Sequence, residues 1–234
     1  MADVGNGQKW APGRGCVLVF DVLGSLLDED TGLRGVVEAN LDLPPERKQG
    51  FIARWSARFE ELVQLIQTGR EPYRNPEALY LQAVVETAGE QAVPLAQNAA
   101  VEMARFGRQL KPFADVPGAL EELALQHPLV ALTNAGSQQA FAMSNHAGLR
   151  WSLLVSGEVV QAYKPDPRMY QYVIRALDVD PQHCVFIAAH PWDLDAAAQH
   201  GFRSAYLDRA ATGGQFEFTA PNLAELVPLL PSAL

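Results

Sequence analysis

Four short, continuous apolar runs constrain the fold of this chain most. They cover residues 16–21, 129–134, 184–190 and 203–207, and a weaker fifth run covers 152–157. Continuous apolar runs of this length are typical of strands buried on both faces, as in a parallel sheet. Helical patterns separate or follow them, at 117–126, 137–147, 167–177 and 193–200. This alternation predicts an α/β fold with a doubly wound parallel sheet, that is, a Rossmann-like core.

The chain between residues 30 and 112 has a different pattern, with helical periodicity and no convincing strand. Periodic apolar residues predict helices over 45–67 and 75–89, and a weaker one near 94–109. Because this stretch is inserted between the first two core strands, we expect a helical subdomain that caps the sheet. We therefore predict an α/β core over residues 1–30 and 112–234 and an all-helical cap over residues 31–111.

Local signals mark the ends of the core helices. Asp166 followed by Pro167 is typical of a helix N-cap and first turn. Gly148 and Gly201 stand where two of the predicted helices should end. Near the C-terminus, the stretch NLAELVPLL predicts one last core helix.

Charge and composition restrict the partners of the protein. The formal net charge of −9 argues against nucleic acid or an anionic membrane as the main partner. The apolar runs are too short for a transmembrane helix, which needs about 18 apolar residues. Residues 1–15 are polar and Gly-rich and lack the apolar centre of a signal peptide. We therefore expect a cytoplasmic protein in which Cys16 and Cys184 are buried, reduced thiols.

Polar residues stand where several of the predicted strands end. Asp21 ends the first strand, and Thr133 and Asn134 end the next. A loop leading to Lys164 and the stretch 190–193 follow two more strands. In an open α/β sheet, ligands bind outside the carboxyl ends of the strands. We therefore expect these residues to meet in one pocket.

Four motifs in this order resemble those of the haloacid dehalogenase superfamily: FDVLGSLLD, LTNAGS, YKPDPRMY and FIAAHPWDLDAAAQHGF. The resemblance covers essentially the whole chain, including a helical cap after the first motif. In that family the aspartate of the first motif is a nucleophile that forms a covalent ester or phosphoester. The resemblance therefore implies that Asp21 is the nucleophile, although a carboxylate at a strand end can also simply cap a turn.

The resemblance assigns roles to further residues, and each has a structural alternative. Ser25 would hydrogen-bond the carboxylate of Asp21 or the substrate, or it would only close a turn. Thr133 and Asn134 would bind the substrate, with Asn134 as a donor, or they would cap the next helix. Lys164 would keep Asp21 ionised, or it would be a solvated surface lysine.

Three more residues complete the predicted site. Tyr170 would either contribute to the site or only pack. Asp193 would orient the hydrolytic water and hold Lys164, or it would be a helix N-cap. His190 stands where the dehalogenases usually have Asn, and it would be a water-activating base, a substrate donor or a packing residue. Ala188 stands where they usually have Ser.

Two absences separate the branches of this family. Its phosphatases carry a second Asp two residues after the nucleophile to protonate the leaving oxygen, and here that position is Leu23. They also hold magnesium with an acidic pair spaced four apart, of which Asp193 is the second member and Ala189 replaces the first. The remaining pattern resembles the L-2-haloacid dehalogenases, which by family analogy need no metal. Leu23 suits a halide leaving group, because halide needs no general acid.

The first predicted cap helix departs from that pattern. The dehalogenases place an Arg directly after a Trp to help bind the halide, whereas Trp55 is followed here by Ser56. Arg54 and Arg58 share one helix face, and residue 56 lies about 200° around the helix from either. A shift of register would let Arg58 serve the halide; without such a shift, neither Arg54 nor Arg58 replaces the missing donor.

The sequence thus predicts a metal-independent hydrolase in which Asp21 displaces halide from a small, anionic 2-haloalkanoic acid through a covalent ester. The residues predicted to contact the substrate are Leu23, Ser25, Trp55, Arg58, Thr133, Asn134 and Tyr170. No cofactor is expected, and by analogy with capped members we expect a homodimer. Two alternatives stay open: a magnesium-dependent phosphatase of a small phosphorylated metabolite, and a catalytically impaired member that acts as a binding module.

Overall fold

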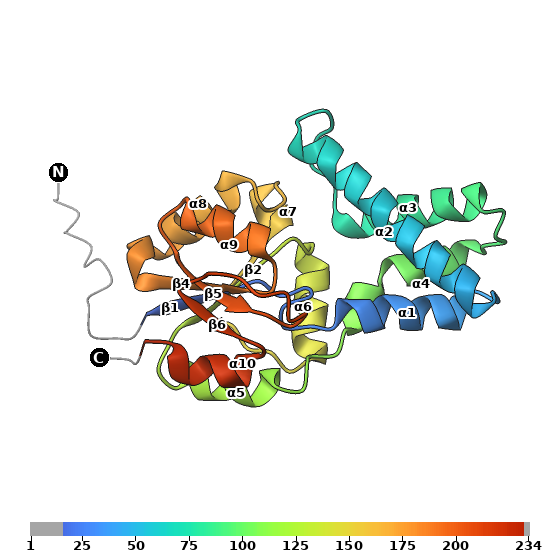
Figure 1. Ribbon diagram of the computed structural model, residues 1–234. Coiled ribbons are helices and arrows are strands. Elements are labelled where there is room, and N and C mark those ends of the chain that lie inside the picture. Colours follow the sequence, from blue (N-terminus) through green and yellow to red (C-terminus); the bar gives the residue numbers. More distant parts are fainter. Residues whose placement is uncertain (1–15, 232–234) are drawn as a thin grey trace.

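The six strands of the chain form one sheet, and helices connect most successive strands (Figure 1). The computed structural model describes residues 16–231; residues 1–15, where we expect no signal peptide, lie outside the described residues. All paired strands are parallel, in the order β3-β2-β1-β4-β5-β6. The strands are β1 Val17–Phe20, β2 Leu129–Thr133, β3 Leu153–Ser156, β4 Cys184–Ala188, β5 Arg203–Leu207 and β6 Phe218–Ala220. The predicted doubly wound α/β core is confirmed.

Side chains of β1 alternate between two apolar cores, one on each face of the sheet. Leu18 and Phe20 belong to one core, and Val17 and Val19 belong to the other. In Figure 1, α8 and α9 lie above the sheet and α5 and α10 lie below it. The core helices are α5 Val116–Ala124, α6 Ser137–His146, α7 Gly157–Val160, α8 Pro167–Leu177, α9 Pro191–Ala198 and α10 Leu223–Leu226, with short 3-10 turns η2 Pro181–His183 and η3 Val227–Leu229. Burial on both faces explains why the strands are continuous apolar runs.

The register of the strands brings the ends of β1, β2 and β4 to one edge of the sheet. Phe20, the last residue of β1, pairs with Ala131 of β2 and Ile187 of β4. Asp21 follows directly, and its backbone N–H donates to the carbonyl of Ile187 at 2.9 Å. The loops that follow β2 and β4 therefore leave the sheet beside Asp21.

Four helices and a 3-10 turn occupy the chain between β1 and α5 and stand to one side of the sheet in Figure 1. They are α1 Glu29–Asn40, α2 Pro45–Gln67, α3 Pro76–Glu90, α4 Gln97–Ala104 and η1 Phe106–Gln109. An aromatic cluster of Trp55, Tyr80 and Phe106 joins α2, α3 and η1. The predicted helical character is confirmed. The limits of the cap at residues 31 and 111 stay a prediction, and α1 spans the first of them.

Three elements have no clear signal in the sequence. Helix α1 contains Thr31, Gly32 and Gly35, which have low helix propensity, and its N-terminus is capped by Asp28, whose side chain accepts from the backbone N–H of Thr31. Helix α7 and strand β6 are too short to show a periodic pattern. Apolar periodicity therefore predicts none of these three elements, and the start of α1 depends on its cap.

The predicted helix ends and the state of the cysteines are confirmed. Asp166 caps α8 by accepting from the backbone N–H of Arg168. Gly148 and Gly201 follow α6 and α9 with positive φ. Cys16 and Cys184 are buried free thiols. Over residues 16–231, no helix has the length and apolar character needed to cross a membrane.

Candidate active site

Asp21 lies at the carboxyl end of β1 and is almost completely buried. Its Oδ1 accepts from Lys164 Nζ at 2.6 Å, and its Oδ2 accepts from Ser25 Oγ at 2.5 Å. The turn between Asp21 and Ser25 requires Gly24, because φ is +72° there and a Cβ would lie 3.0 Å from His190 Nε2. The expected contact between Ser25 and the Asp21 carboxylate is therefore present.

Lys164 is a buried cation held between two carboxylates. Its Nζ lies 2.6 Å from Asp21 Oδ1 and 2.5 Å from Asp193 Oδ2. The hydroxyl of Tyr170 donates to Asp193 Oδ1 at 2.5 Å. Burial lowers the pKa of Lys164, but the charges of Asp193 and Asp21 outweigh this effect and raise the pKa above its ordinary value. Lys164 is thus a permanent positive charge inside the protein and not a surface lysine.

Asp193 is fully buried, so the charge of its carboxylate is stabilised by hydrogen-bond partners and not by water. Burial raises the pKa of Asp193, and the positive charge of Lys164 opposes this rise. Each of its two oxygens accepts one hydrogen bond, from Lys164 and from Tyr170. Its geometry therefore suits a residue that fixes Lys164 beside Asp21.

Ser25 and Asn134 also hold backbone groups of neighbouring loops. Ser25 Oγ accepts from the backbone N–H of Ala189 at 2.8 Å, which joins the loop after β1 to the loop after β4. Asn134 Oδ1 accepts from the backbone N–H of Lys164 at 2.7 Å. Thr133 Oγ1 accepts from the N–H of Ala135 at 3.2 Å, as a turn-capping residue does. Asn134 therefore positions the lysine loop through its side-chain oxygen.

His190 lies beside Asp21 and is partly exposed. Its Nε2 is 3.2 Å from the carbonyl oxygen of Leu23 and 3.6 Å from Asp21 Oδ2, and its ring stacks on Trp192. A carbonyl oxygen can only accept, so Nε2 carries the proton in the contact with Leu23. The neutral imidazole then has its lone pair on Nδ1, which is the atom that a base function would use.

The two apolar residues predicted to contact the substrate differ in position. Leu23 is half-buried in the loop next to Asp21, with its backbone carbonyl turned to His190. Trp55 is completely buried among the helices of the insertion, and its Nε1 donates to the carbonyl of Tyr80 at 3.0 Å. Trp55 is therefore a packing residue in this structure.

The arginines of α2 are engaged by glutamates rather than by Asp21. Arg58 donates to Glu86 at 2.5 Å and to Glu61 at 2.8 Å. Arg54 donates to Glu90 at 2.7 Å and to Glu61 at 2.8 Å. Each guanidinium thus has two carboxylate partners on α2 and α3. None of these contacts involves Asp21 or the residues bonded to it.

Two residues that the sequence patterns do not indicate lie close to the site. Glu29, the first residue of α1, accepts from the hydroxyl of Tyr80 at 3.2 Å, and burial raises its pKa to about 7. Gln67, the last residue of α2, donates to the backbone carbonyl of Lys164 at 2.8 Å. Both contacts join segments far apart in sequence, so no local pattern reveals them.

The residues around Asp21 do not fit a magnesium ion. Over residues 16–231 there is no group of three His, Cys, Asp or Glu side chains that could hold a metal ion. Ala189 offers no side-chain ligand, and the amine of Lys164 contacts both Asp21 and Asp193. A hard cation needs a shell of oxygen ligands, whereas here the ammonium group of Lys164 already lies between the two carboxylates.

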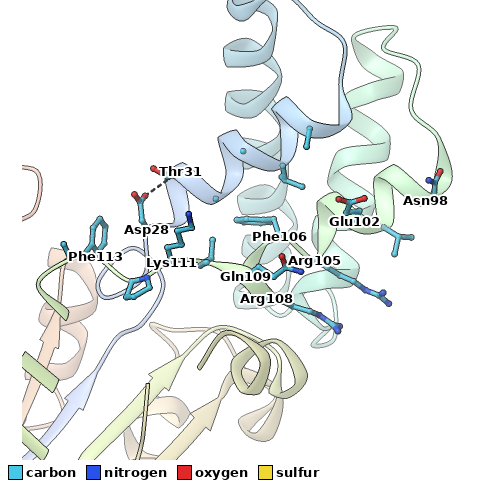
Figure 2. Close-up of a pocket in the computed structure, with 18 residues that line it drawn as sticks. Asp28, Thr31, Asn98, Glu102, Arg105, Phe106, Arg108, Gln109, Lys111 and Phe113 are labelled. Carbon is cyan, nitrogen blue, oxygen red and sulfur yellow. Dashed lines mark hydrogen bonds between the residues drawn. The ribbon is translucent and has the colours of Figure 1, made fainter. Parts of the chain in front are cut away.

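A separate cavity of about 1020 Å³ opens beside the start of α1 (Figure 2). Residues of α1, α4 and η1 and of the stretch 110–114 line it. Its charged lining residues carry both signs: Asp28, Glu102, Arg105, Arg108 and Lys111. The predicted site residues, all of which are described, do not line this cavity, so it is distinct from the cluster around Asp21.

Known proteins resemble this chain over most of its length. A model of the family described as haloacid dehalogenase-like hydrolase matches residues 17–201. The (S)-2-haloacid dehalogenase of Pseudomonas sp. (strain YL) is 30% identical over 203 residues, which cover 86% of this chain and 84% of that protein. A solved L-2-haloacid dehalogenase has a TM-score of 0.82 and 26% identity, and the match covers 92% of this chain and 98% of the other.

A third match shows the fold alone. The L-2-haloacid dehalogenase from Xanthobacter autotrophicus, solved with chloropropionic acid covalently bound, has a TM-score of 0.77 and 22% identity, over 92% of this chain and 98% of the other. Together with the family match, these similarities show that the chain belongs to the haloacid dehalogenase-like hydrolases. Within that family of enzymes, it is of the L-2-haloacid dehalogenase type.

Proposed function

We propose that this enzyme hydrolyses a small 2-haloalkanoic acid without a metal ion, with Asp21 as the nucleophile. The observation that carries the proposal is the buried Lys164 amine, which lies 2.6 Å from Asp21 and 2.5 Å from Asp193. A permanent cation at this distance favours an ionised, nucleophilic Asp21 and does the work that a metal would do elsewhere. The matched (S)-2-haloacid dehalogenase supports the choice of substrate class.

In the first step, a carboxylate oxygen of Asp21 attacks carbon 2 of the substrate. A carbon–oxygen bond forms, the carbon–halogen bond breaks, and halide leaves with the bonding electrons. Halide needs no proton to leave, so the apolar Leu23 near Asp21 is chemically suitable. Ser25 Oγ, 2.5 Å from Asp21 Oδ2, restricts the carboxylate to one orientation.

In the second step, water attacks the carbonyl carbon of the Asp21 ester, the bond from that carbon to the substrate oxygen breaks, and the 2-hydroxy acid leaves with one of the two protons of the water. This attack produces one proton, which must be accepted near Asp21. Nδ1 of His190 is the acceptor that we propose, because Nε2 faces the carbonyl of Leu23 and both oxygens of Asp193 already accept hydrogen bonds. Asp193 would hold Lys164, and Asn134 would donate to the substrate carboxylate.

The phosphatase alternative has less support. It needs an acid for the leaving oxygen, and Leu23 stands at the position of that acid. It also needs a full shell of ligands for magnesium, and Ala189 stands at the position of one of them. The binding-module alternative is set aside because the chain belongs to a family of hydrolases.

Turnover of both enantiomers of 2-chloropropionate tests the proposal, with chloride and lactate measured in EDTA and then in magnesium. We expect chloride and lactate in equal amounts with the (S) enantiomer, unchanged by EDTA. Asp21→Asn should abolish turnover while the protein stays folded. Hydrolysis of phosphate esters that stops in EDTA, with no chloride released from either enantiomer, would contradict the proposal.

A further inference from the structure

Arg209 makes three kinds of contact around the chain segments that lead into and out of α1–α4. It lies two residues beyond β5, and its side chain is only 14% exposed. Its Nε donates to the backbone carbonyl of Ser25 at 2.6 Å. Its Nη1 and Nη2 donate to Asp115 at 3.2 and 3.1 Å, and its guanidinium lies 3.9 Å from the ring centroid of Phe113.

These partners flank the two crossings between the sheet and the helical insertion. The outgoing segment 26–28 and the returning segment 111–113 lie side by side. The N–H of Phe113 donates to the carbonyl of Leu26 at 3.0 Å, and the N–H of Asp28 donates to the carbonyl of Lys111 at 2.9 Å. Figure 2 shows Asp28, Lys111 and Phe113 close together at the start of α1. Arg209 therefore contacts the chain just before the first crossing and at the end of the second.

We propose that Arg209 is a positioning residue that clamps the two crossing segments to the sheet and thereby holds Ser25 against Asp21. The inference rests on the proposed function in one respect, since it takes Asp21 as the reacting group. The carbonyl that Arg209 binds belongs to the residue whose Oγ lies 2.5 Å from Asp21 Oδ2. A small shift of that backbone would move the hydroxyl away from the carboxylate.

The chemistry of the contact requires arginine. A planar guanidinium donates in several directions at once, so it binds a backbone carbonyl and a carboxylate while stacking on an aromatic ring. A lysine has one nitrogen at the end of a flexible chain and cannot fill the three roles together. Asp115 is held in turn by the backbone N–H of Leu223, which donates to its Oδ2 at 2.7 Å. The clamp therefore connects the crossings to β5 and to the start of α10.

Arg203, the first residue of β5, is a matched control close in sequence to Arg209. It also pairs with a carboxylate, Glu217, and its guanidinium lies 5.1 Å from the ring centroid of Phe218. Its contacts involve neither crossing segment. The variants to compare are Arg209→Met, Arg209→Lys and Asp115→Asn against Arg203→Met.

Two measurements separate positioning from general stability. The first is kcat and KM with (S)-2-chloropropionate, per mole of folded protein. We expect kcat to fall about 10- to 100-fold in Arg209→Met and Arg209→Lys, less in Asp115→Asn, and not in Arg203→Met. KM should change by no more than about threefold, because a misplaced Ser25 affects the reacting carboxylate more than substrate binding.

The second measurement is amide hydrogen exchange, which does not depend on any substrate. The N–H groups of Asp28 and Phe113 should exchange about tenfold faster or more in the Arg209 variants, while those of β5 keep their wild-type rates. Wild-type kcat in both Arg209 variants would overturn the proposal. The proposal would also be overturned if amide exchange increased evenly over the whole protein and kcat per folded molecule did not fall.

The remaining outcomes are also decisive. If Arg209→Met does not fold, Arg209→Lys and Asp115→Asn provide the comparison. If the wild type does not turn over 2-chloropropionate, the proposed function fails, and exchange at Asp28 and Phe113 alone decides whether Arg209 is a clamp.

Discussion

At the scale of single residues, Lys164 is the cation that opposes the negative charges of Asp21 and Asp193. Its ammonium group faces two carboxylates in a volume from which water is excluded. Removing one partner from a buried ion pair leaves an uncompensated charge, which is far more costly than losing an exposed pair. The stability of the core and the positive charge beside Asp21 therefore depend on the same side chain.

Lys164→Met should lower the free energy of unfolding by about 3–5 kcal/mol at pH 7, measured by urea denaturation. The deficit should shrink as the pH is lowered, because burial raises the pKa of Asp193 and its unpaired carboxylate then takes up a proton. Arg168→Met is the matched control, since Arg168 makes an exposed pair with Asp166 at 2.8 Å, and its effect should stay within about 1 kcal/mol. Equal effects of the two substitutions would contradict this account of Lys164.

Glu29 makes a second contribution to the free energy of unfolding, and this contribution depends on pH. Its pKa is raised to about 7 by burial, so the folded protein binds a proton there that the unfolded chain releases near pH 4.5. Stability from this group is therefore complete below pH 4.5 and is lost as the pH rises toward 7. Glu29→Gln keeps an acceptor for the Tyr80 hydroxyl but removes the titration.

Chemical denaturation at pH 4 and pH 8 tests this effect. At pH 8, Glu29→Gln should be more stable than the wild type by about 2–3 kcal/mol, and at pH 4 the two should be nearly equal. Glu61→Gln, on the exposed ion-pair network of α2, is a control for loss of a surface charge. A difference that is the same at both pH values would show that Glu29 does not titrate as described.

Ion pairs between helices α2 and α3 hold the guanidinium groups of Arg54 and Arg58. Arg58 is held by Glu86 and Glu61, which the sequence periodicity of α2 alone does not reveal, because Glu86 lies on another helix. Arg58→Met should therefore change KM for 2-chloropropionate by no more than about threefold, which corresponds to about 0.6 kcal/mol. A rise in KM of tenfold or more would show instead that Arg58 serves the substrate.

The elements that could be predicted from sequence are those with a strong local cause. Apolar runs buried on both faces predict five of the six strands, and the amphipathic patterns of 45–67 and 75–89 predict α2 and α3. Helix α1 is held by the Asp28 cap and by packing despite its glycines, so local preference does not predict it. The order of the strands and the contact of Gln67 with Lys164 depend on tertiary structure.

Across the whole molecule, the site is assembled from four separate loops. Strand ends in the sequence predict that Asp21, Asn134, Lys164 and Asp193 meet, and the family resemblance adds Ser25. Each of these residues is joined to at least one other by a hydrogen bond of 2.5–2.7 Å. Arg209 and Glu29 have no such signal, because their partners are 184 and 51 residues away in the chain. Motifs therefore predict the reacting centre but not the residues that support it from a distance.

The central claim is that substrate becomes covalently attached to Asp21, and turnover in water enriched in oxygen-18 tests it most directly. After many turnovers of (S)-2-chloropropionate, the peptide that contains Asp21 is isolated and its mass is measured. An ester hydrolysed at the Asp21 carbonyl must leave oxygen-18 in that carboxylate, and in a single turnover the lactate must receive ordinary oxygen from the protein. Unlabelled Asp21, with oxygen-18 already in the lactate of the first turnover, would show that water attacks the substrate directly.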